Sequence, residues 1–570
     1  MNVKRPEDLE KIKKGKMKLL SPTRTRITVG LATCGLAKGA GKIFEALKYE
    51  VKKRKLTADV VAVGCNGLCY AEPIVEVIRS GKPRLTYGGV SLEKLGELVQ
   101  SIKTGNVLKD MVLMRQDEAT PSLATQPIPY AKGKLPKAYA DVKEYRRLNF
   151  YKRQMKLVSA NAGTIDPGSI DEYIASNGYA SLAKVLSTMS PEGVIKEVTE
   201  AKLRGRGGAG FPTGVKWQAC RNADGDKKYV VCNGSEGDPE IGMHRSFLES
   251  DPHLVIEGML IAGYAIGAEE GYIYLNDRYL LALERIECAI KQAEKLGVLG
   301  KNIMGSSFSF SLKVKRGGGS YVCGEETALL NALEGSFGEP RPRPPFPAEE
   351  GLYGNPTVIN NLETLANVPL IGLRGGKWFS KIGTVSSKGT KIVALSGNVA
   401  QSCWVEVPLG MSIKEIIDTF GKGTTPGKKI KAFQTGGPSG GMLPAKSLNM
   451  KLDYDQLNKA GSLLGSGGLL VMDEDTDMLD MAKFFTDFFA DESCGKCSIC
   501  REGTKRLQEI LGDIMDGQGT KGHINLIKRM AAAMEDTSAC AFGKTAAVPI
   551  VSVLKHFSKE IERKLIGKRA

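Results

Sequence analysis

Four cysteines near the C-terminal end of the sequence have the spacing of iron–sulfur ligands. Cys494, Cys497 and Cys500 form a C-x-x-C-x-x-C run, and Cys540 follows 40 positions later. Three closely spaced thiolates and one remote thiolate are the ligand set of a [4Fe–4S] cube. Because such a cluster carries one electron at a time, the sequence predicts a protein that moves electrons.

Three more cysteines occur near the N-terminal end. Cys34 follows one predicted strand, and Cys65 and Cys69 follow another with C-x-x-x-C spacing. This segment resembles thioredoxin-like ferredoxins, which hold a [2Fe–2S] cluster through two cysteine pairs, but Gly39 stands where the first pair would have its second cysteine. Since such a cluster normally takes four protein ligands, two alternatives follow: a [2Fe–2S] cluster with an unusual ligand, or an empty domain retained for docking.

A glycine-rich segment in the middle of the chain has the composition of an anion-binding loop. Residues 203–217 contain five glycines, and Arg206 and Lys216 in the same segment can add full positive charges toward an anionic ligand. Glycines allow sharp turns and close approach of a ligand, and successive backbone N–H groups form a concavity that binds anions. The G-x-G-x-x-G pattern at 205–210 is weak evidence for a dinucleotide fold by itself, because no clear hydrophobic strand precedes it.

Two further segments add groups that suit a cofactor pocket. Residues 229–240 read as a strand that delivers Asn233, Glu236 and Asp238 into a loop, where amide and carboxylate groups can bond to hydroxyls and ring edges. Residues 314–335 contain a glycine loop before Tyr321 and a helix that begins at about Gly324. Together the three segments predict a deep pocket for a phosphorylated, planar cofactor.

Composition limits the classes of function. The chain has 570 residues, which at about 150 residues per domain predicts about four domains. A hydrophobic content of 42% is typical of a soluble globular protein, and no apolar run approaches the roughly 18–20 residues of a membrane-spanning helix. The first residues are charged rather than apolar, so we expect no secretory signal and a cytoplasmic location. The net charge of +17 is dispersed along the chain, which argues against nucleic acid and suits acidic partners.

The order of patterns along the chain predicts a multidomain α/β and α protein. Strand and helix patterns alternate at first, glycine-rich loops follow, and a helical pattern surrounds the four cluster cysteines. We expect a charged extension (1–24), a thioredoxin-like, ferredoxin-like domain (25–107), a linker (108–148), a glycine-rich α/β domain (149–388), a small β-rich, ubiquitin-like (β-grasp-like) module (389–475) and a helical [4Fe–4S] bundle (476–570).

Several long motifs resemble one known family. The segments are 205–217, 323–329, 344–347, 359–364 and 493–503. In this order they are similar to motifs of the FMN- and NADH-binding subunit of respiratory complex I and its soluble relatives, the diaphorase subunits of NAD-linked hydrogenases and formate dehydrogenases. The resemblance covers about residues 150–570. It implies that the domain at 149–388 binds FMN and NADH.

The resemblance also implies roles for individual residues. Phe211 and Phe346 would wall the nicotinamide on the flavin face, and Glu326 would lie near the adenosine ribose, where a carboxylate favours NAD over NADP. Asp238 and Arg343 complete the implied NADH contacts, and Cys494, Cys497, Cys500 and Cys540 the cluster ligands. The implied FMN contacts are Gly205, Arg206, Gly207, Gly208, Ala209, Gly210, Lys216, Asn233, Ser235, Glu236, Tyr321, Gly324, Glu325, Asn360 and Asn361.

This chain departs from the family pattern near the implied flavin edge. The family usually has an aspartate where this chain has Ser235, and a lysine common in its proline-rich loop is Arg343 here. Loss of one negative charge beside FMN eases formation of anionic flavin states. We therefore expect a flavin potential somewhat higher than that of a Ser235→Asp variant.

The implied activity is that of an NADH dehydrogenase subunit in a multi-subunit redox complex. NADH donates a hydride and an iron–sulfur cluster accepts one electron, so FMN between them joins the two. Expected partners are a small [2Fe–2S] thioredoxin-like subunit and a larger iron–sulfur or catalytic subunit, with no nucleic acid and no membrane span. Two alternatives stay open: an electron-bifurcating subunit that couples NADH and ferredoxin, and a scaffold or electron-relay subunit without NAD turnover.

Overall fold

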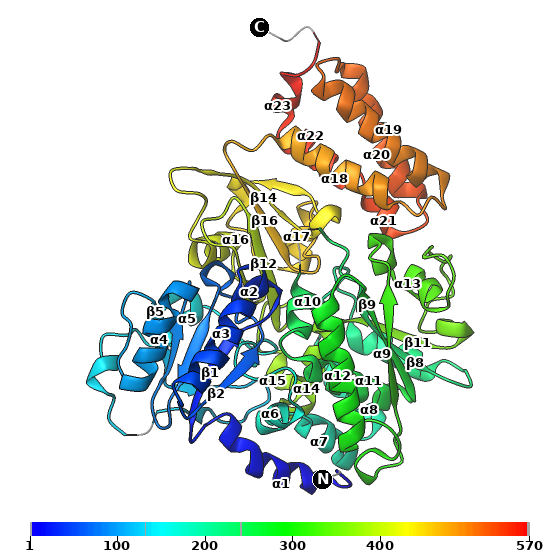
Figure 1. Ribbon diagram of the computed structural model, residues 1–570. Helices are drawn as coiled ribbons and strands as arrows, with labels where there is room; N and C mark the ends of the chain where they lie inside the picture. The colour runs from blue at the N-terminus through cyan, green and yellow to red at the C-terminus, as the bar shows by residue number, and fades with distance from the viewer. Residues whose placement is uncertain (1–2, 132, 240–241, 567–570) are drawn as a thin grey trace.

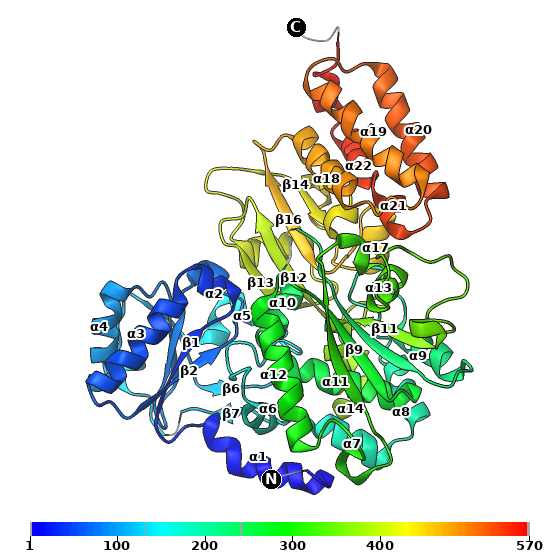
Figure 2. The same ribbon diagram turned by 45° about the vertical axis from the view of Figure 1, so that its right-hand side comes forward.

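The protein folds as a mixed α/β chain with three main sheets and a bundle of helices. The computed structural model describes residues 3–131, 133–239 and 242–566. The first residues of the expected extension, the last residues of the expected bundle and Glu240 of the 229–240 segment therefore lie outside the described residues. The first sheet lies at the left of Figures 1 and 2, the central α/β unit at the right and the helical bundle at the top. A small β-rich module lies between the bundle and the other two parts.

The first sheet places the N-terminal cysteines at one of its edges. It has the strand order β2-β1-β3-β4-β5, in which β1 and β2 are parallel and the other pairs antiparallel. Val75 and Val77 point to the face covered by α3 and α4, whereas Glu76 points to the opposite, polar face. The elements are β1 (Thr25–Gly30), α2 (Thr33–Ala37), α3 (Ala40–Lys53), β2 (Ala58–Val63), β3 (Val75–Ile78), β4 (Arg84–Tyr87), α4 (Leu92–Thr104) and β5 (Val112–Gln116).

The segment expected as a linker contains regular structure. Strand β5 extends the first sheet beside β4, and β6 (Glu118–Ala119) and β7 (Ile128–Pro129) form a short pair. Only Met114 of β5 is buried, so this strand lacks the alternating apolar pattern by which a strand is recognised in a sequence. The prolines and charges of the segment instead indicated a linker. The N-terminal extension is mostly helix α1 (Pro6–Lys16), which packs Leu9 and Ile12 against α6 and α7.

The central unit has a fully parallel sheet with the order β10-β9-β8-β11. Helix α11 is buried around nearly its whole circumference and packs against α14, α7 and α8. The strands are β8 (Tyr229–Gly234), β9 (Glu270–Asn276), β10 (Ser311–Gly317) and β11 (Thr357–Asn361). The helices are α5 (Asn149–Lys152), α6 (Ile170–Ala175), α7 (Ala180–Thr188), α8 (Pro191–Glu200), α9 (Thr213–Asn222), α10 (Met243–Leu248), α11 (Pro252–Ile266), α12 (Leu280–Leu296), α13 (Glu326–Leu333), α14 (Leu362–Arg374) and α15 (Gly376–Phe379).

The small module has the sheet order β13-β12-β16-β14-β15, in which β12 and β16 are parallel neighbours. Its strands are β12 (Thr390–Gly397), β13 (Cys403–Pro408), β14 (Ile430–Thr435), β15 (Met442–Pro444) and β16 (Gly468–Asp473), and its helices are α16 (Ile413–Ile416) and α17 (Tyr454–Lys459). The bundle above it consists of α18 (Met478–Glu492), α19 (Ser498–Met515), α20 (Lys521–Thr537), α21 (Ala541–Thr545), α22 (Val548–His556) and α23 (Ser558–Glu562).

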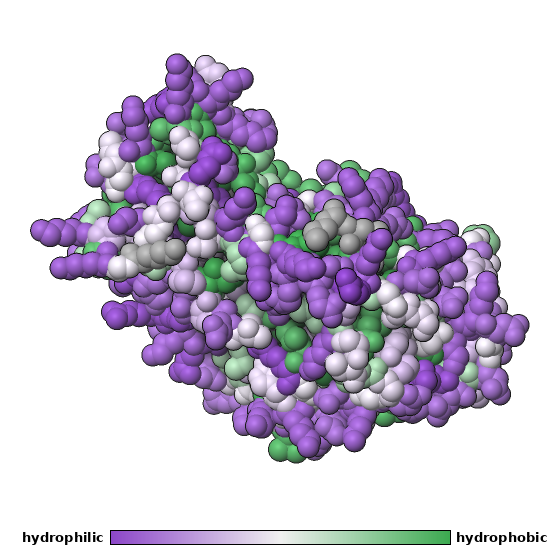
Figure 3. Space-filling view, turned by 90° about the horizontal axis from the view of Figure 1, so that it is seen from below, coloured by the Kyte–Doolittle hydropathy of each residue, from purple (hydrophilic) through white to green (hydrophobic). Residues whose placement is uncertain are grey.

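The surface is mainly polar where Figure 3 shows it. The face seen from below is largely hydrophilic, with small, scattered groups of hydrophobic residues. Among the described residues, no helix has both the length and the apolar character needed to cross a membrane.

Candidate functional site

Several of the predicted cofactor residues lie where the strand order of the central sheet reverses. Successive strands β8, β9 and β10 are added on one side, and β11 then returns to the other side of β8. Open α/β sheets bind ligands at such a switch point, outside the carboxyl ends of the strands. Asn233 and Asn361 are register partners at the carboxyl ends of β8 and β11. We call these strand ends, the 205–210 loop and residues 324–326 the cradle.

The glycine loop lies against the cradle and against the small module. An ideal Cβ on Gly207 would lie 3.1 Å from Cβ of Asn361, so this loop and the end of β11 are in close contact. Gly210 has a φ of +64°, and a Cβ there would lie 2.6 Å from the ring of Tyr454. Tyr454 donates a hydrogen bond of 2.7 Å to the carbonyl of Gly205. The module therefore fixes the shape of the loop.

Arg206 braces the loop, in contrast to the expectation that its charge faces a ligand. Its guanidinium is buried and donates to the carbonyls of Arg204, Lys388 and Thr390. Its backbone N–H donates to Thr364 Oγ1 at 2.8 Å. All three guanidinium nitrogens thus have protein acceptors, and the side chain satisfies carbonyl groups of the segments that flank the loop.

Glu236 also has a structural task that its sequence motif does not reveal. Its carboxylate accepts the backbone N–H groups of His244 at 2.7 Å and Arg245 at 3.0 Å, which places a negative charge at the start of α10. The His244 ring contacts Asn361, with 3.0 Å between Nε2 and Nδ2. Burial lowers the pKa of His244, so this ring is neutral beside the cradle.

Small polar groups line the end of β8. Asn233 donates to the carbonyl of Gly324 at 2.9 Å, and its own oxygen accepts the Ser235 hydroxyl at 2.9 Å. These bonds join the second and third predicted segments on either side of the cradle. Asn360 is buried and accepts the Trp217 indole N–H at 2.8 Å, which fixes the floor beneath them.

A balanced set of charges lies at the start of α13. Lys216 donates to Glu326 at 2.7 Å, and Arg343 lies 3.8 Å from Glu325 and 3.9 Å from Glu326. Glu325 caps α13 through Oε2, whereas its buried Oε1 accepts no hydrogen bond from the described residues. Since buried polar atoms are normally satisfied, this oxygen fits a donor from a bound cofactor, such as a hydroxyl group.

Two aromatic side chains stand exposed: Phe211 beside Lys216, and Phe346 three positions after Arg343. Phe211 is 51% exposed and Phe346 is 52% exposed, and the Lys216 ammonium lies 6.0 Å from the centre of the Phe211 ring. Exposed rings next to paired charges suit the stacking of a planar ligand. Several of the residues expected to bind FMN and NADH therefore lie near one another, and Arg206 and Glu236 act there as supports.

Tyr321 connects the cradle to the helical bundle. Its backbone N–H donates to Glu492 at 2.8 Å, and its hydroxyl lies 3.2 Å from Ser439 of the module. Its ring is 5.9 Å from that of Phe542. Burial raises the pKa of Tyr321, so the hydroxyl stays protonated. Asp238 lies beside the same module loop, where a Cβ on Gly437 would clash with its carboxylate.

The four cluster cysteines meet between α18 and α21 of the bundle. Cys494, Cys497, Cys500 and Cys540 line one small hollow together with Phe542 and Pro340. Burial raises the pKa of the Cys500 thiol to about 11, so ligation must release its proton. Four thiols around one apolar hollow fit a [4Fe–4S] cube.

The cluster hollow is tied to the cradle by residues that the sequence motifs do not single out. Lys496 donates to the carbonyl of Pro340 at 2.8 Å, and Glu492 holds the Tyr321 loop. Glu492 stands two positions before Cys494, which is the one sequence signal that could have identified it. Cradle and cluster thus share a hydrogen-bonded boundary.

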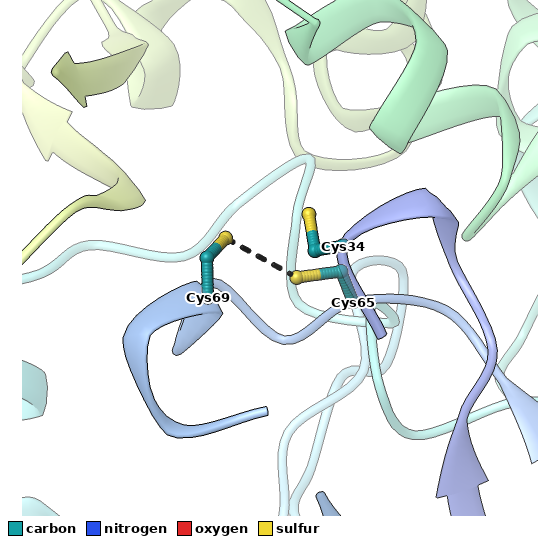
Figure 4. Close-up of side chains that lie close together, drawn as sticks. All are labelled: Cys34, Cys65 and Cys69. Carbon is teal, nitrogen blue, oxygen red and sulfur yellow. Dashed lines mark hydrogen bonds between the residues drawn. The ribbon is translucent and has the colours of Figure 1, made fainter. Parts of the chain in front are cut away.

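The three N-terminal cysteines also meet, as Figure 4 shows. The sulfur atoms of Cys34, Cys65 and Cys69 all lie within 4.8 Å of one another. Gly39 does not take part, since an ideal Cβ there has no heavy atom within 4 Å. The described residues provide three thiols and no fourth, so they do not fit the complete ligand set of a [2Fe–2S] cluster. Three thiolates could hold a single soft cation.

A separate hollow lies beneath the polar face of the first sheet. Its volume is about 390 Å³, and it is lined by the buried Glu76–Arg84 pair of β3 and β4 and by Lys156. The residues predicted to bind FMN or NADH are all described by the structure, and none of them lines this hollow. Despite its size, this hollow is therefore not the pocket that the motif residues predict for FMN.

Two regions of the chain match known domain families. Residues 198–370 match the Nuo51 FMN-binding domain, and residues 480–564 match the NADH-ubiquinone oxidoreductase-F iron-sulfur binding region. The first range includes the cradle and the second includes all four cluster cysteines. The class defined by fold and site is therefore that of flavin- and iron–sulfur-containing oxidoreductases.

Known proteins resemble the chain over most of its length. The NADP-reducing hydrogenase subunit HndC of Solidesulfovibrio fructosivorans is 50% identical over 418 residues, which cover 73% of this chain and 85% of that one. The F 2 subunit of NADH-quinone oxidoreductase from Rhizobium meliloti (strain 1021) is 44% identical over 400 residues, covering 70% and 95%. A solved structure of NAD+-reducing [NiFe]-hydrogenase in the H2-reduced state matches with a TM-score of 0.65 and 26% identity, covering 99% and 90%.

The chain belongs to the family that contains the F subunits of NADH-quinone oxidoreductases and the related hydrogenase subunits. It is an oxidoreductase subunit that depends on FMN and a [4Fe–4S] cluster. The resemblance inferred from the sequence motifs is confirmed, as are these cofactors.

Proposed function

We propose that the chain is the diaphorase subunit of a multi-subunit redox complex, in which electrons from NADH leave through the [4Fe–4S] cluster toward partner subunits. The carrying observation is the boundary between cradle and cluster: Tyr321 binds Glu492 through its backbone and packs its ring beside Phe542. Bound FMN supplies the step from hydride to single electrons. The chain supplies position, charge and exclusion of water.

Each part of the cradle has a distinct task in this proposal. The 205–210 loop offers backbone N–H groups to a phosphate, and the unsatisfied Glu325 oxygen accepts from a hydroxyl group. The exposed rings of Phe211 and Phe346 would wall a bound nicotinamide and so orient it for hydride transfer. Glu326, which is paired with Lys216, would discriminate against a 2′-phosphate through its negative charge. No proton has to move at these residues for hydride transfer.

The partners and finer domain types are also part of the proposal. The names of the relatives support partner subunits, and we infer a small [2Fe–2S] subunit and a larger iron–sulfur or catalytic one. The order of the first sheet supports a thioredoxin-like domain. The central parallel pair of the module, β12 and β16, supports a β-grasp-like one.

Dye reduction by the purified chain tests this function. We expect NADH to reduce ferricyanide and a viologen dye when FMN and the cluster are present. A Cys540→Ser variant should lose viologen reduction but keep FMN, because Cys540 is a cluster ligand and lies outside the cradle. A chain that binds FMN and the cluster but shows no NADH-dependent reduction would be a relay or scaffold instead. Coupled reduction of ferredoxin by the complex would identify bifurcation.

A further inference from the structure

The three N-terminal thiols converge from two loops at the edge of the first sheet. Cys34 lies in α2 just after β1, and Cys65 and Cys69 lie in the loop that follows β2. Because β1 and β2 are parallel neighbours, both loops leave the sheet at the same edge. Figure 4 shows the three side chains close together, with the sulfur atoms of Cys65 and Cys69 facing each other. The strand pairing therefore builds this cluster.

The spacing of these sulfur atoms suits one metal ion. Cys65 and Cys69 have 3.7 Å between their sulfur atoms, and all three sulfur atoms lie within 4.8 Å. A tetrahedral zinc ion with bonds of about 2.3 Å separates its sulfur ligands by roughly 3.8 Å. In a [2Fe–2S] cluster the cysteines bind two separate irons, so the sulfur atoms of different pairs are farther apart.

The four cluster cysteines of the bundle provide an internal comparison. Within the described part of the chain, Cys34, Cys65 and Cys69 are the one group of three potential ligands with mutual distances below 4.8 Å. The bundle cysteines are all described, and no three of them meet this limit, as expected for thiolates that bind different irons of a cube. The two cysteine groups therefore have different geometries in one chain, and only the N-terminal group has mononuclear spacing.

We propose that Cys34, Cys65 and Cys69 bind a single Zn²⁺ ion, with a fourth ligand from outside the chain. Three thiolates around a divalent cation leave a net charge of −1. The N–H of Gly67 is 3.4 Å from the Cys65 sulfur and donates to it, which stabilises thiolate character.

The site has a structural consequence, because its loops form part of the contact between the first sheet and the rest of the chain. A Cβ on Gly64 would clash with Ser250, which follows α10, and a Cβ on Gly67 with the carbonyl of Trp404 in β13. Thr33, next to Cys34, donates to Glu249 at 2.8 Å through its backbone. A zinc ion that fixes these loops therefore stabilises the docking of the N-terminal domain.

Metal and sulfide analysis of the full-length holoprotein tests the proposal. We expect one zinc per chain beside the four irons and four sulfides of the cube. A Cys34→Ser variant should lose the zinc and keep the iron, whereas Cys288→Ser should keep both, because Cys288 belongs to neither cysteine group. Replacement of zinc by Co²⁺ should give thiolate-to-cobalt charge-transfer absorption in the wild type and none in Cys34→Ser.

Three results would overturn the proposal. These are about six irons and six sulfides per chain, which would indicate an additional [2Fe–2S] cluster; the absence of zinc from protein that contains the complete cube; and zinc that stays bound to Cys34→Ser. Each readout is independent of NADH oxidation, so a failure of the proposed function leaves this test intact. Limited proteolysis adds a second measure: we expect faster cleavage between the N-terminal domain and the remainder in Cys34→Ser than in Cys288→Ser.

Discussion

A buried ion pair holds the cofactor cradle against the small module. Lys391 of β12 and Glu363 of α14 bind one another with almost no exposure to solvent. Lys391 also donates to the carbonyl of Ser466 at 2.6 Å, and Glu363 accepts the N–H of Ile392 at 2.9 Å. Because Thr364, the next residue, holds the backbone of Arg206, the pair supports the glycine loop.

Lys391→Met removes the cation and leaves a buried carboxylate without its charge partner. Loss of one partner of a buried pair costs about 3–5 kcal/mol. At about 2–4 °C per kcal/mol for a domain of this size, the thermal midpoint should fall by about 6–20 °C. Lys414→Met is the matched control, since its exposed pair with Asp418 in the same module contributes about 0.3–0.5 kcal/mol.

The assay follows flavin fluorescence on heating and the FMN content of the purified chain. We expect Lys391→Met to lose FMN more readily, with an affinity at least tenfold weaker. The double variant Lys391→Met/Glu363→Gln should regain much of the stability, because it removes the buried charge and keeps an acceptor for Ile392. A midpoint for Lys391→Met within about 2 °C of wild type, together with unchanged FMN content, would refute this reasoning.

Three other substitutions test separate parts of the account. Ser235→Asp adds a negative charge beside the cradle and should lower the flavin potential on the order of 30 mV; potentiometry that finds no shift or a rise would contradict this. Glu326→Gln removes a charge that repels a 2′-phosphate and should raise kcat/KM for NADPH relative to NADH about tenfold; steady-state kinetics with an unchanged ratio would place Glu326 away from the ribose. Burial raises the pKa of Asp251 to about 7. The folded wild type therefore has its full stability below the unfolded pKa of about 3.8, and it loses stability as the pH rises from there toward 7. Asp251→Asn should therefore gain stability relative to wild type between pH 5 and pH 8 by about 2–4 kcal/mol, and a constant difference in denaturation midpoints would exclude this linkage.

The sequence predicts best where local residue types fix local chemistry. The C-x-x-C-x-x-C run and the glycine loop are readable because thiolate spacing and the conformational freedom of glycine belong to short segments. The family resemblance then predicted that distant motifs share one site. In the structure, Asn233 and Asn361 of two such motifs are register partners on neighbouring strands. Those partners lie 128 positions apart, and no local pattern gives their pairing.

Tasks that depend on tertiary contact could not be read in this way. Arg206 was expected to offer its charge to a ligand, but its acceptors include carbonyls of Lys388 and Thr390, far along the chain. Glu236 accepts from the first backbone N–H groups of α10, which begins at Met243, seven positions later in the chain. Strand β5 could not be predicted from its own polar residues, because it forms by pairing with β4.

Anaerobic titration of the purified full-length chain with NADH tests the central claim most directly. We predict about one FMN per chain, with bleaching of flavin absorbance and the appearance of the reduced cluster signal in electron paramagnetic resonance on addition of NADH. A fully matured chain that contains four irons and four sulfides but binds no FMN, or whose flavin and cluster stay oxidised with excess NADH, would contradict the account.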